Sequence, residues 1–277
     1  MTGSVLLLCA RQELTLAVRS RWTQVFAVVF AALSLAVAAS GYVLSGGSGV
    51  QDFARTTASL VQLVLLLVPM TSLTVGILAL APDRGQAELL FSQPVSRRTI
   101  FLGQILGVFA ALAAAQAIGL GAAGLVIFSR SGEAGAAGYA ALFAASLVLT
   151  AVFLGLAALL SAGNPGRRAR ALALALMVWF GAVVLWDVAA LGLASLLPSG
   201  AASRVLILAV LVNPIDAVRT GTLLAVQGTT AFGAASLAFL RFTRGPAGAA
   251  CLLGLSALAW IVLPLAAAAR RMTRADL

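Results

Sequence analysis

The sequence predicts an all-α integral membrane protein with six transmembrane helices. Its 277 residues are 62% hydrophobic with a mean hydropathy of +1.08, and only 9% of them are charged. A soluble globular protein carries about 25% charged residues, because its surface must be covered by polar groups. The apolar stretches also lack the alternation of polar and apolar residues that the strands of a membrane barrel show. A helical bundle in a bilayer is therefore the predicted fold class.

Six stretches are long and apolar enough to cross a bilayer. A spanning helix needs about 20 apolar residues, at a rise of 1.5 Å each, to cross roughly 30 Å of hydrocarbon. The six stretches cover residues 22–44, 57–80, 99–128, 139–160, 171–197 and 247–269. Five of them contain no charged side chain, and the fifth along the chain contains Asp187. We therefore expect residues 1–277 to form a single membrane domain without an attached soluble domain.

Residues 1–21, before the first span, predict a helix that lies on the inner membrane surface. Their apolar run is short and is followed at once by Arg11, which is not the pattern of a cleaved signal peptide. An interfacial helix places its charged side chains among the lipid headgroups. Arg11, Glu13, Arg19 and Arg21 would occupy those positions here.

The placement of the arginines predicts the orientation. All 18 basic residues are arginines, and cytoplasmic loops carry an excess of basic residues. One side of the membrane would hold Arg11, Arg19, Arg21, Arg84, Arg97, Arg98, Arg167, Arg168, Arg170, Arg270, Arg271 and Arg274. The other side would hold Arg55, Arg130, Arg204, Arg219, Arg241 and Arg244. The first side is richer, so we expect both termini to lie in the cytoplasm.

Residues 198–246 make up a long segment on the outer side, where we expect a helical hairpin. The run 205–212 would form one arm and 222–240 the other, with Asn213-Pro214 near the turn. The stretch 222–240 is itself long enough to span the membrane. A seventh crossing would place the C-terminal arginines outside, which the charge rule disfavours. The hairpin is the preferred interpretation, and the seventh span is the alternative.

The segment 81–98 connects the second and third spans. Residues 83–91 predict a short helix, which Pro94 would end because the residue before a proline avoids helical geometry. Large apolar side chains exposed to the cytosol are unfavourable unless a partner or lipid covers them. We interpret the segment as a coupling helix that docks on another protein; a plain helical turn between two spans is the alternative. Its candidate contact residues are Asp83, Arg84, Glu88, Leu89, Leu90, Phe91 and Pro94.

Asp187 is the only acidic residue deep within a predicted span. It lies about 15 Å from the end of that span, near the middle of the membrane. A central aspartate costs roughly 2.5–3.5 kcal/mol on insertion, so it should face the helix bundle or water. A structural hydrogen bond to a neighbouring helix is the preferred role, since no arginine or histidine in the spans offers a partner for proton relay. A proton or substrate site is the alternative.

The composition argues against catalytic and metal sites. The chain has no histidine, and Cys9 and Cys251 are far apart in the sequence. Zinc centres and His-based catalytic centres need residues that are absent here. The chain also has no lysine, which a nucleotide-binding P-loop requires. We expect a chain that is not an enzyme, holds no metal or cofactor and binds no nucleic acid.

Several glycines match nucleotide-binding or helix-packing patterns. Gly119, Gly121 and Gly124 spell G-x-G-x-x-G, but they lie inside an uncharged span instead of between a strand and a helix. Gly103 and Gly107 have the GxxxG spacing that brings helices close together in membranes. We interpret both sets as positions of close helix packing.

The segment Leu89-Leu90-Phe91-Ser92-Gln93-Pro94-Val95-Ser96-Arg97 resembles the coupling-helix signature of type-2 ABC transporter permeases. The opening Ala10-Arg11-Gln12-Glu13-Leu14 and the run Val68-Pro69-Met70 are similar to the same family. Trp179-Phe180 with Asp187, and the run 212–216 with Arg219, resemble the NosY-like branch, which is associated with the maturation of multicopper enzymes such as nitrous oxide reductase. Gln86-Ala87 and Gln104 depart from the usual family residues.

The resemblance implies a permease subunit that works with other chains. A second permease copy and cytoplasmic ABC ATPase subunits, which bind ATP and Mg²⁺, would complete the transporter within the lipid of a bacterial inner membrane. The NosY-like branch further implies a periplasmic solenoid subunit on the outer side, for which Asn213, Pro214, Asp216 and Arg219 are the candidate docking residues. Two alternatives are a type-2 exporter of a lipid or drug and, from another class, a secondary transporter or channel that uses Asp187.

Overall fold

Helices make up every regular element in the described part of the chain, which in this computed structural model comprises residues 2–43, 50–81, 95–131, 135–162, 168–228 and 234–274. Six helical segments are long and apolar enough to cross a membrane, and they coincide with the six predicted stretches. The predicted all-α membrane fold with six spans is therefore confirmed.

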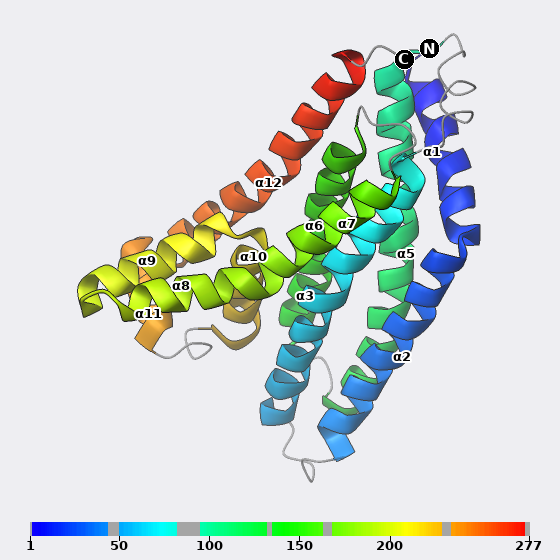
Figure 1. Cartoon of the computed structure of the whole chain (residues 1–277). Helices are drawn as coiled ribbons and strands as arrows, with labels where there is room; N and C mark the ends of the chain where they lie inside the picture. The colour runs from blue at the N-terminus through cyan, green and yellow to red at the C-terminus, as the bar shows by residue number, and fades with distance from the viewer. Residues whose placement is uncertain are drawn as a thin grey trace.

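The elements follow one another as a chain of long helices (Figure 1). Helix α1 (Thr2–Arg19) precedes the first span, α2 (Arg21–Val43). The next three spans are α3 (Val50–Leu80), α5 (Arg97–Ser131) and α6 (Ala136–Ser161). The fifth span consists of α7 (Arg168–Phe180), the π-helical turn η1 (Gly181–Leu185) and α8 (Trp186–Ser195). Helices α9 (Ser199–Val212), α10 (Pro214–Gln227) and α11 (Ala234–Phe242) lead to the last span, α12 (Pro246–Arg274).

Helix α6 occupies the centre of the bundle, where it contacts α3, α5, α7, α10 and α12. It carries no charged residue, and Phe153 on it is completely buried. Lipid tails are as apolar as leucine, so helices in a bilayer associate through close packing and hydrogen bonds. One such bond joins α5 to α6: the buried Gln116 amide donates to the Thr150 hydroxyl at 2.7 Å. This contact helps to fix the register of the two central spans.

Helix α1 runs beside the first turns of α5, and two glycines of α5 make the close approach possible. A Cβ atom added at Gly103 would lie 2.5 Å from the Cβ of Cys9, and one added at Gly107 would lie 2.5 Å from the carbonyl oxygen of Ala10. The expected close packing at Gly103 and Gly107 is thereby confirmed. The helix predicted over residues 1–21 is present as α1, and its position relative to the membrane surface stays a prediction.

The G-x-G-x-x-G glycines also act in packing, at two of their three positions. Gly119 faces the ring of Phe30 on α2, and Gly124 faces the ring of Tyr139 on α6. Nothing within 4 Å faces Gly121 among the described residues. The expectation that these glycines serve helix packing is confirmed for Gly119 and Gly124.

Helices α9 and α10, which we call the outer hairpin after the side predicted for it, differ in detail from the prediction. The turn lies at Asn213-Pro214 as expected, and α9 and α10 meet there at an angle of 101°. The second arm begins at Pro214 and ends at Gln227, because Gly228 takes up a left-handed φ of 63°. The stretch 222–240 is therefore not one continuous helix: α10 ends within it, and α11 starts at Ala234.

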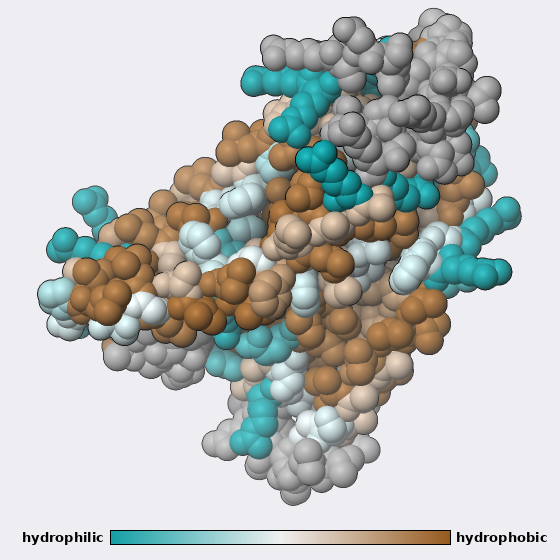
Figure 2. All heavy atoms as spheres, viewed as in Figure 1, coloured by the Kyte–Doolittle hydropathy of each residue, from teal (hydrophilic) through white to brown (hydrophobic). Residues whose placement is uncertain are grey.

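Apolar residues dominate the membrane-facing surface. Figure 2 shows hydrophobic residues over much of the visible face, including α7, α8 and α2, with most hydrophilic residues toward its edges. The fifth span is the least buried of the six within the protomer, and its exposed side chains include Met177, Phe180 and Leu191. This span offers a large apolar surface to lipid or to another chain.

We expect Gly107→Ala to loosen the contact between α1 and α5. The added methyl group would press on the backbone of α1, and such overpacking costs about 1–3 kcal/mol. Gly121→Ala is the matched control, since it makes the same change on α5 in open space and gains about 1 kcal/mol of helix propensity. The midpoint of thermal unfolding in detergent should fall for Gly107→Ala and stay equal or rise for Gly121→Ala. Equal midpoints for the two variants would contradict this packing.

Candidate functional site: the joint between the fifth span and the outer hairpin

The break between α9 and α10 leaves backbone carbonyls at the end of α9 that need hydrogen-bond donors. Within a membrane, an unsatisfied backbone group costs several kcal/mol. Side chains of α12 supply two of these donors, and α8 adds a bond to a neighbouring carbonyl. The indole N–H of Trp260 on α12 donates to the carbonyl of Val212 at 2.8 Å. The indole N–H of Trp186 on α8 donates at 3.1 Å to the carbonyl of Ala209, which also accepts from the backbone N–H of Asn213. The Ser256 hydroxyl donates to the carbonyl of Leu211 at 2.6 Å.

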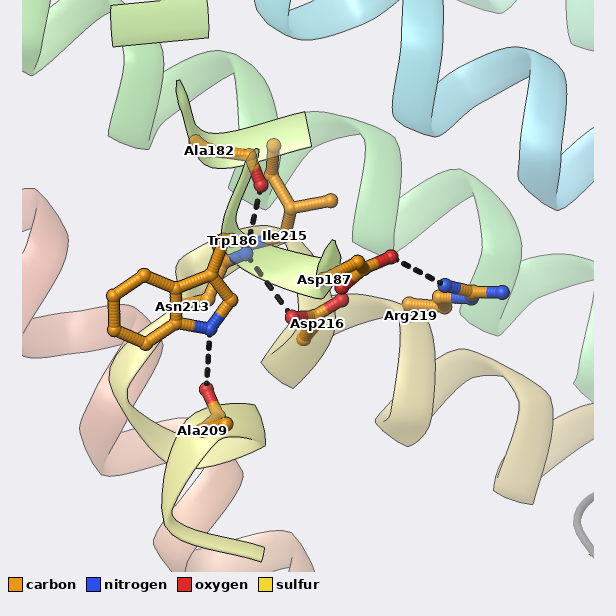
Figure 3. Close-up of polar contacts among 8 residues, drawn as sticks. All are labelled: Ala182, Trp186, Asp187, Ala209, Asn213, Ile215, Asp216 and Arg219. Atoms are coloured by element: carbon orange, nitrogen blue, oxygen red, sulfur yellow. Dashed lines mark hydrogen bonds and ion pairs between the residues drawn. The ribbon is translucent and has the colours of Figure 1, made fainter. Parts of the chain in front are cut away.

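Asn213 caps α10 and ties it to the fifth span (Figure 3). Its Oδ1 accepts from the backbone N–H of Ile215 at 3.1 Å, in the manner of a helix N-cap. Its Nδ2 donates to the carbonyl of Ala182 at 2.8 Å and to the carboxylate of Asp216 at 3.0 Å. Only 4% of Asn213 is exposed. One amide side chain thus bonds to both the fifth span and the start of α10.

The π-helical turn of the fifth span presents the carbonyl that Asn213 needs. At the end of η1, the N–H of Trp186 donates to the carbonyl of Gly181, five residues earlier, instead of to that of Ala182. Single π-turns of this kind occur often at functional sites, because they change which backbone groups are available. The Ala182 carbonyl can therefore accept from Asn213, and the irregular turn and the helix break satisfy each other.

We call the π-helical turn η1 together with the break at Asn213-Pro214 the joint. Three ionisable side chains meet beside it. The Arg219 guanidinium on α10 pairs with the carboxylate of Asp187 on α8, with Nη1 and Oδ2 3.5 Å apart. The carboxyl group of Asp216 faces that of Asp187 (Figure 3), and Arg219 acts electrostatically on Asp216 as well. The Arg219 side chain is 35% exposed and that of Asp187 43%, whereas Asp216 is 8% exposed. Two carboxyl groups thus share one guanidinium across α8 and α10.

These contacts correct one step of the sequence interpretation of Asp187. No arginine was expected among the spans as its partner, and Arg219 was placed in an outer loop. The fold brings Arg219 to Asp187 because α9 packs on α8 and the chain then turns by 101° into α10. The expectation of a partner on a neighbouring helix is met by an ion pair.

The other predicted outer residues lie inside the protomer. Asn213, Pro214 and Asp216 are buried. Asn213 bonds to the π-helical turn η1, and Asp216 lies beside Asp187 on α8. Arg219 is half-buried and paired. Docking of a periplasmic partner at this end stays a prediction. These four residues would serve it by holding α9 and α10 in place.

The predicted coupling residues Asp83, Arg84, Glu88, Leu89, Leu90, Phe91 and Pro94 lie outside the described residues. The helices on either side of them are described. Helix α3 ends at Leu80, and Ser96 begins the turn into α5, where its hydroxyl and that of Thr99 lie 2.6 Å apart. The coupling role of the segment stays a prediction.

Two side chains join α3 to the fifth span. Arg168, at the start of α7, donates to the carbonyl of Leu78 near the end of α3 at 2.7 Å. Trp179 donates its indole N–H to the carbonyl of Leu66 at 3.2 Å, close to Pro69, where the α3 backbone lacks one hydrogen-bond donor. The end of α3 nearest residues 83–91 is therefore bonded to the same span that carries the joint.

Sequence reasoning missed the donors from outside the hairpin. Trp186, Trp260 and Ser256 lie in the spans and were not singled out as site residues. A buried indole N–H seeks a hydrogen-bond partner, so tryptophans within apolar spans are a usable signal. The sequence alone does not say which carbonyl each one meets, since that depends on the bend at Asn213.

Comparison with known proteins places the chain in a family. The family model described as "ABC-2 family transporter protein" matches residues 7–277. The chain belongs to the ABC-2 transporter family. It is 33% identical over 235 residues to the "Probable ABC transporter permease protein NosY" of Pseudomonas aeruginosa, covering 83% of this chain and 85% of the relative. The protein of the same name from Stutzerimonas stutzeri is 34% identical, covering 82% and 85%.

Membership in the ABC-2 family sets the broad role. The chain is a multi-pass membrane permease subunit of an ABC transporter, and such a permease works with an ATPase subunit. In this family member, the joint lies between the fifth span and the segment that leads to the sixth. The joint therefore belongs to the connection between two spans of the permease.

The charges at the joint predict that Arg219→Gln lowers the stability of the protein more than Asp187→Asn does. Asp187→Asn leaves one carboxyl group and one guanidinium, which can still pair. Arg219→Gln leaves two facing carboxyl groups without a cation, in a medium where unpaired charges are costly. We expect the thermal midpoint to fall further for Arg219→Gln, and the double variant to recover part of that loss. The loss in Arg219→Gln should also shrink at low pH, where the carboxyl groups are protonated.

The control is Arg204→Gln on α9, which removes an exposed arginine from another helix of the hairpin. It should leave the midpoint unchanged. If Asp187→Asn were the more harmful change, or if the double variant were no better than Arg219→Gln, the shared guanidinium would not be the feature that stabilises the joint.

Proposed function

We propose that this permease converts ATP binding and hydrolysis in its partner ATPase into movement of the outer hairpin. The observation that supports it is a continuous set of side-chain bonds. Arg168 and Trp179 join α3 to the fifth span, and Asn213 and Arg219 join the fifth span to α10. Motion that enters at the coupling segment, directly after α3, can thus reach α9 and α10 through bonded elements.

The joint has space next to it in which such movement can occur. A hollow of about 230 Å³ lies between α6, the fifth span and α12, and its walls include Phe153, Trp186 and Trp260. This hollow is open on one side. A shift of α10 next to it would therefore displace mobile lipid or solvent instead of packed side chains. The hollow is almost entirely apolar, so it suggests no charged cargo.

The biological setting that we propose is the maturation of a multicopper enzyme such as nitrous oxide reductase. The similarity to two permeases named NosY supports this setting. Both termini would lie in the cytoplasm of a bacterial inner membrane, with the hairpin facing a periplasmic solenoid subunit. The chain itself would carry out no covalent chemistry and bind no metal or cofactor, while ATP and Mg²⁺ bind the partner ATPase.

Two copies of the permease would complete the membrane part of the transporter. The fifth span supports this arrangement, because it is the least buried span and presents apolar side chains along its length. A type-2 exporter of a lipid or drug is compatible with the same assembly. A secondary transporter that uses Asp187 is less favoured, because Arg219 neutralises that carboxylate.

Leu90→Asp tests the coupling step. A charge at a buried apolar contact costs several kcal/mol unless it is paired. We expect the variant permease to insert normally but to lose the ATPase subunit during co-purification, or to retain it without ATP-dependent function. Gln93→Asp is the matched control, since it adds the same charge to an already polar position of the segment. Full ATPase association and function in Leu90→Asp would contradict the proposed coupling helix.

A further inference from the structure

A second hollow lies on the other side of the hairpin, between α10, α11 and α12. It measures about 310 Å³ and is almost entirely apolar. Its walls include Gly221, Leu224, Leu240, Ala250 and Leu253. The flanking helices also carry exposed apolar side chains, among them Leu237, Leu252 and Leu255. We call this hollow the α10–α12 groove.

Two exposed arginines lie at the turn that closes one end of the α10–α12 groove. Arg241 and Arg244 fall between Leu240 and Pro246, both of which line the groove. The backbone of the turn is well fixed, because the N–H of Gly245 donates to the carbonyl of Leu240 at 2.8 Å. Arg244 has a φ of 60°, which is uncommon for a residue with a side chain. The turn therefore fixes the backbone positions of two arginines beside an apolar hollow.

Neither arginine has an acidic partner among the residues that the structure describes. Asp216 is the only acidic residue in the described parts of α9 to α12, and it bonds to Asn213 at the joint. The groove thus combines an apolar body with an unneutralised positive rim. The ligand that matches this pattern has an anionic group attached to a hydrocarbon chain.

The length of α12 places the rim at the level of the lipid headgroups. From Pro246 to Arg270 the helix rises about 36 Å, against roughly 30 Å of hydrocarbon. When Arg270 and Arg271 lie at one membrane surface, Arg241 and Arg244 lie near the other. The groove itself then opens at the depth of the acyl chains, which a partner protein in the aqueous phase does not reach.

We propose that the α10–α12 groove binds an anionic phospholipid of the leaflet opposite Arg270 and Arg271. The phosphate would accept hydrogen bonds from Arg241 and Arg244, and an acyl chain would fill the apolar hollow. The bound lipid would cover surfaces of α10, α11 and α12 at once. It would thereby stabilise the hairpin against the last span, on the side away from the Asp187–Arg219 pair.

The test uses the purified full-length permease in detergent, exchanged with phosphatidylglycerol or phosphatidylcholine of identical acyl chains. Bound lipid is counted by native mass spectrometry, and the thermal midpoint is measured with each lipid. We expect preferential retention of phosphatidylglycerol and a higher midpoint with it. Each of Arg241→Gln and Arg244→Gln should lower the preference about fivefold, since an arginine near the surface contributes about 1 kcal/mol to the binding of anionic lipid.

Three controls separate this site from other sources of binding. Arg204→Gln removes the same charge from α9, which does not line the groove, and should leave the preference unchanged. Ala250→Phe fills the groove and should lower retention of both lipids while the protein stays folded. Glycerol phosphate without acyl chains should displace no lipid.

Equal retention of both lipids by the unaltered protein would overturn the proposal. An unchanged preference in the double variant of Arg241 and Arg244, or a loss in Arg204→Gln as large as theirs, would also overturn it. The same holds for undiminished lipid retention in Ala250→Phe. Displacement by glycerol phosphate would point to a soluble anion and would also contradict lipid binding.

Discussion

The main constraint on this structure is the break between α9 and α10, which lies within an apolar protein. Where α9 ends and α10 begins, backbone groups lose their helical partners, and no water is available in hydrocarbon to replace them. Asn213 meets both needs, since its amide caps the N–H of Ile215 and bonds to the carbonyl of Ala182. The π-turn of the fifth span and the bend of the hairpin are thus one structural unit. Neither irregularity would be stable without the other.

This unit explains why the hairpin is bonded to the fifth span in particular. Trp186 and Asp187 are neighbours on α8, and they bond respectively to the end of α9 and to Arg219 on α10. Trp260 adds a bond from α12. The hairpin is therefore bonded to the fifth and sixth spans. Arg168 in turn connects the fifth span to α3. Under the proposed function, these connections would carry a force from the coupling segment to the hairpin.

The sequence predicted the spans well because span length and apolarity are local properties. It also located the turn at Asn213-Pro214, since proline and asparagine mark breaks in helices. The partner of Asp187 could not be predicted, because Arg219 reaches it only after the chain turns by 101° at the joint. The same holds for Trp186 and Trp260, whose acceptors are set by the tertiary arrangement. Local chemistry thus identified the elements, while the contacts between distant residues needed the fold.

The central claim is that Asn213 holds the π-turn and the start of α10 together. Hydrogen exchange in the unaltered protein and in Asn213→Ala tests it most directly. The account predicts that the variant loses protection in two segments at once, 182–187 and 213–217, while the core of α6 stays protected. Protection lost only around residue 213, or in neither segment, would contradict the account, because the two irregular turns would then be stable independently.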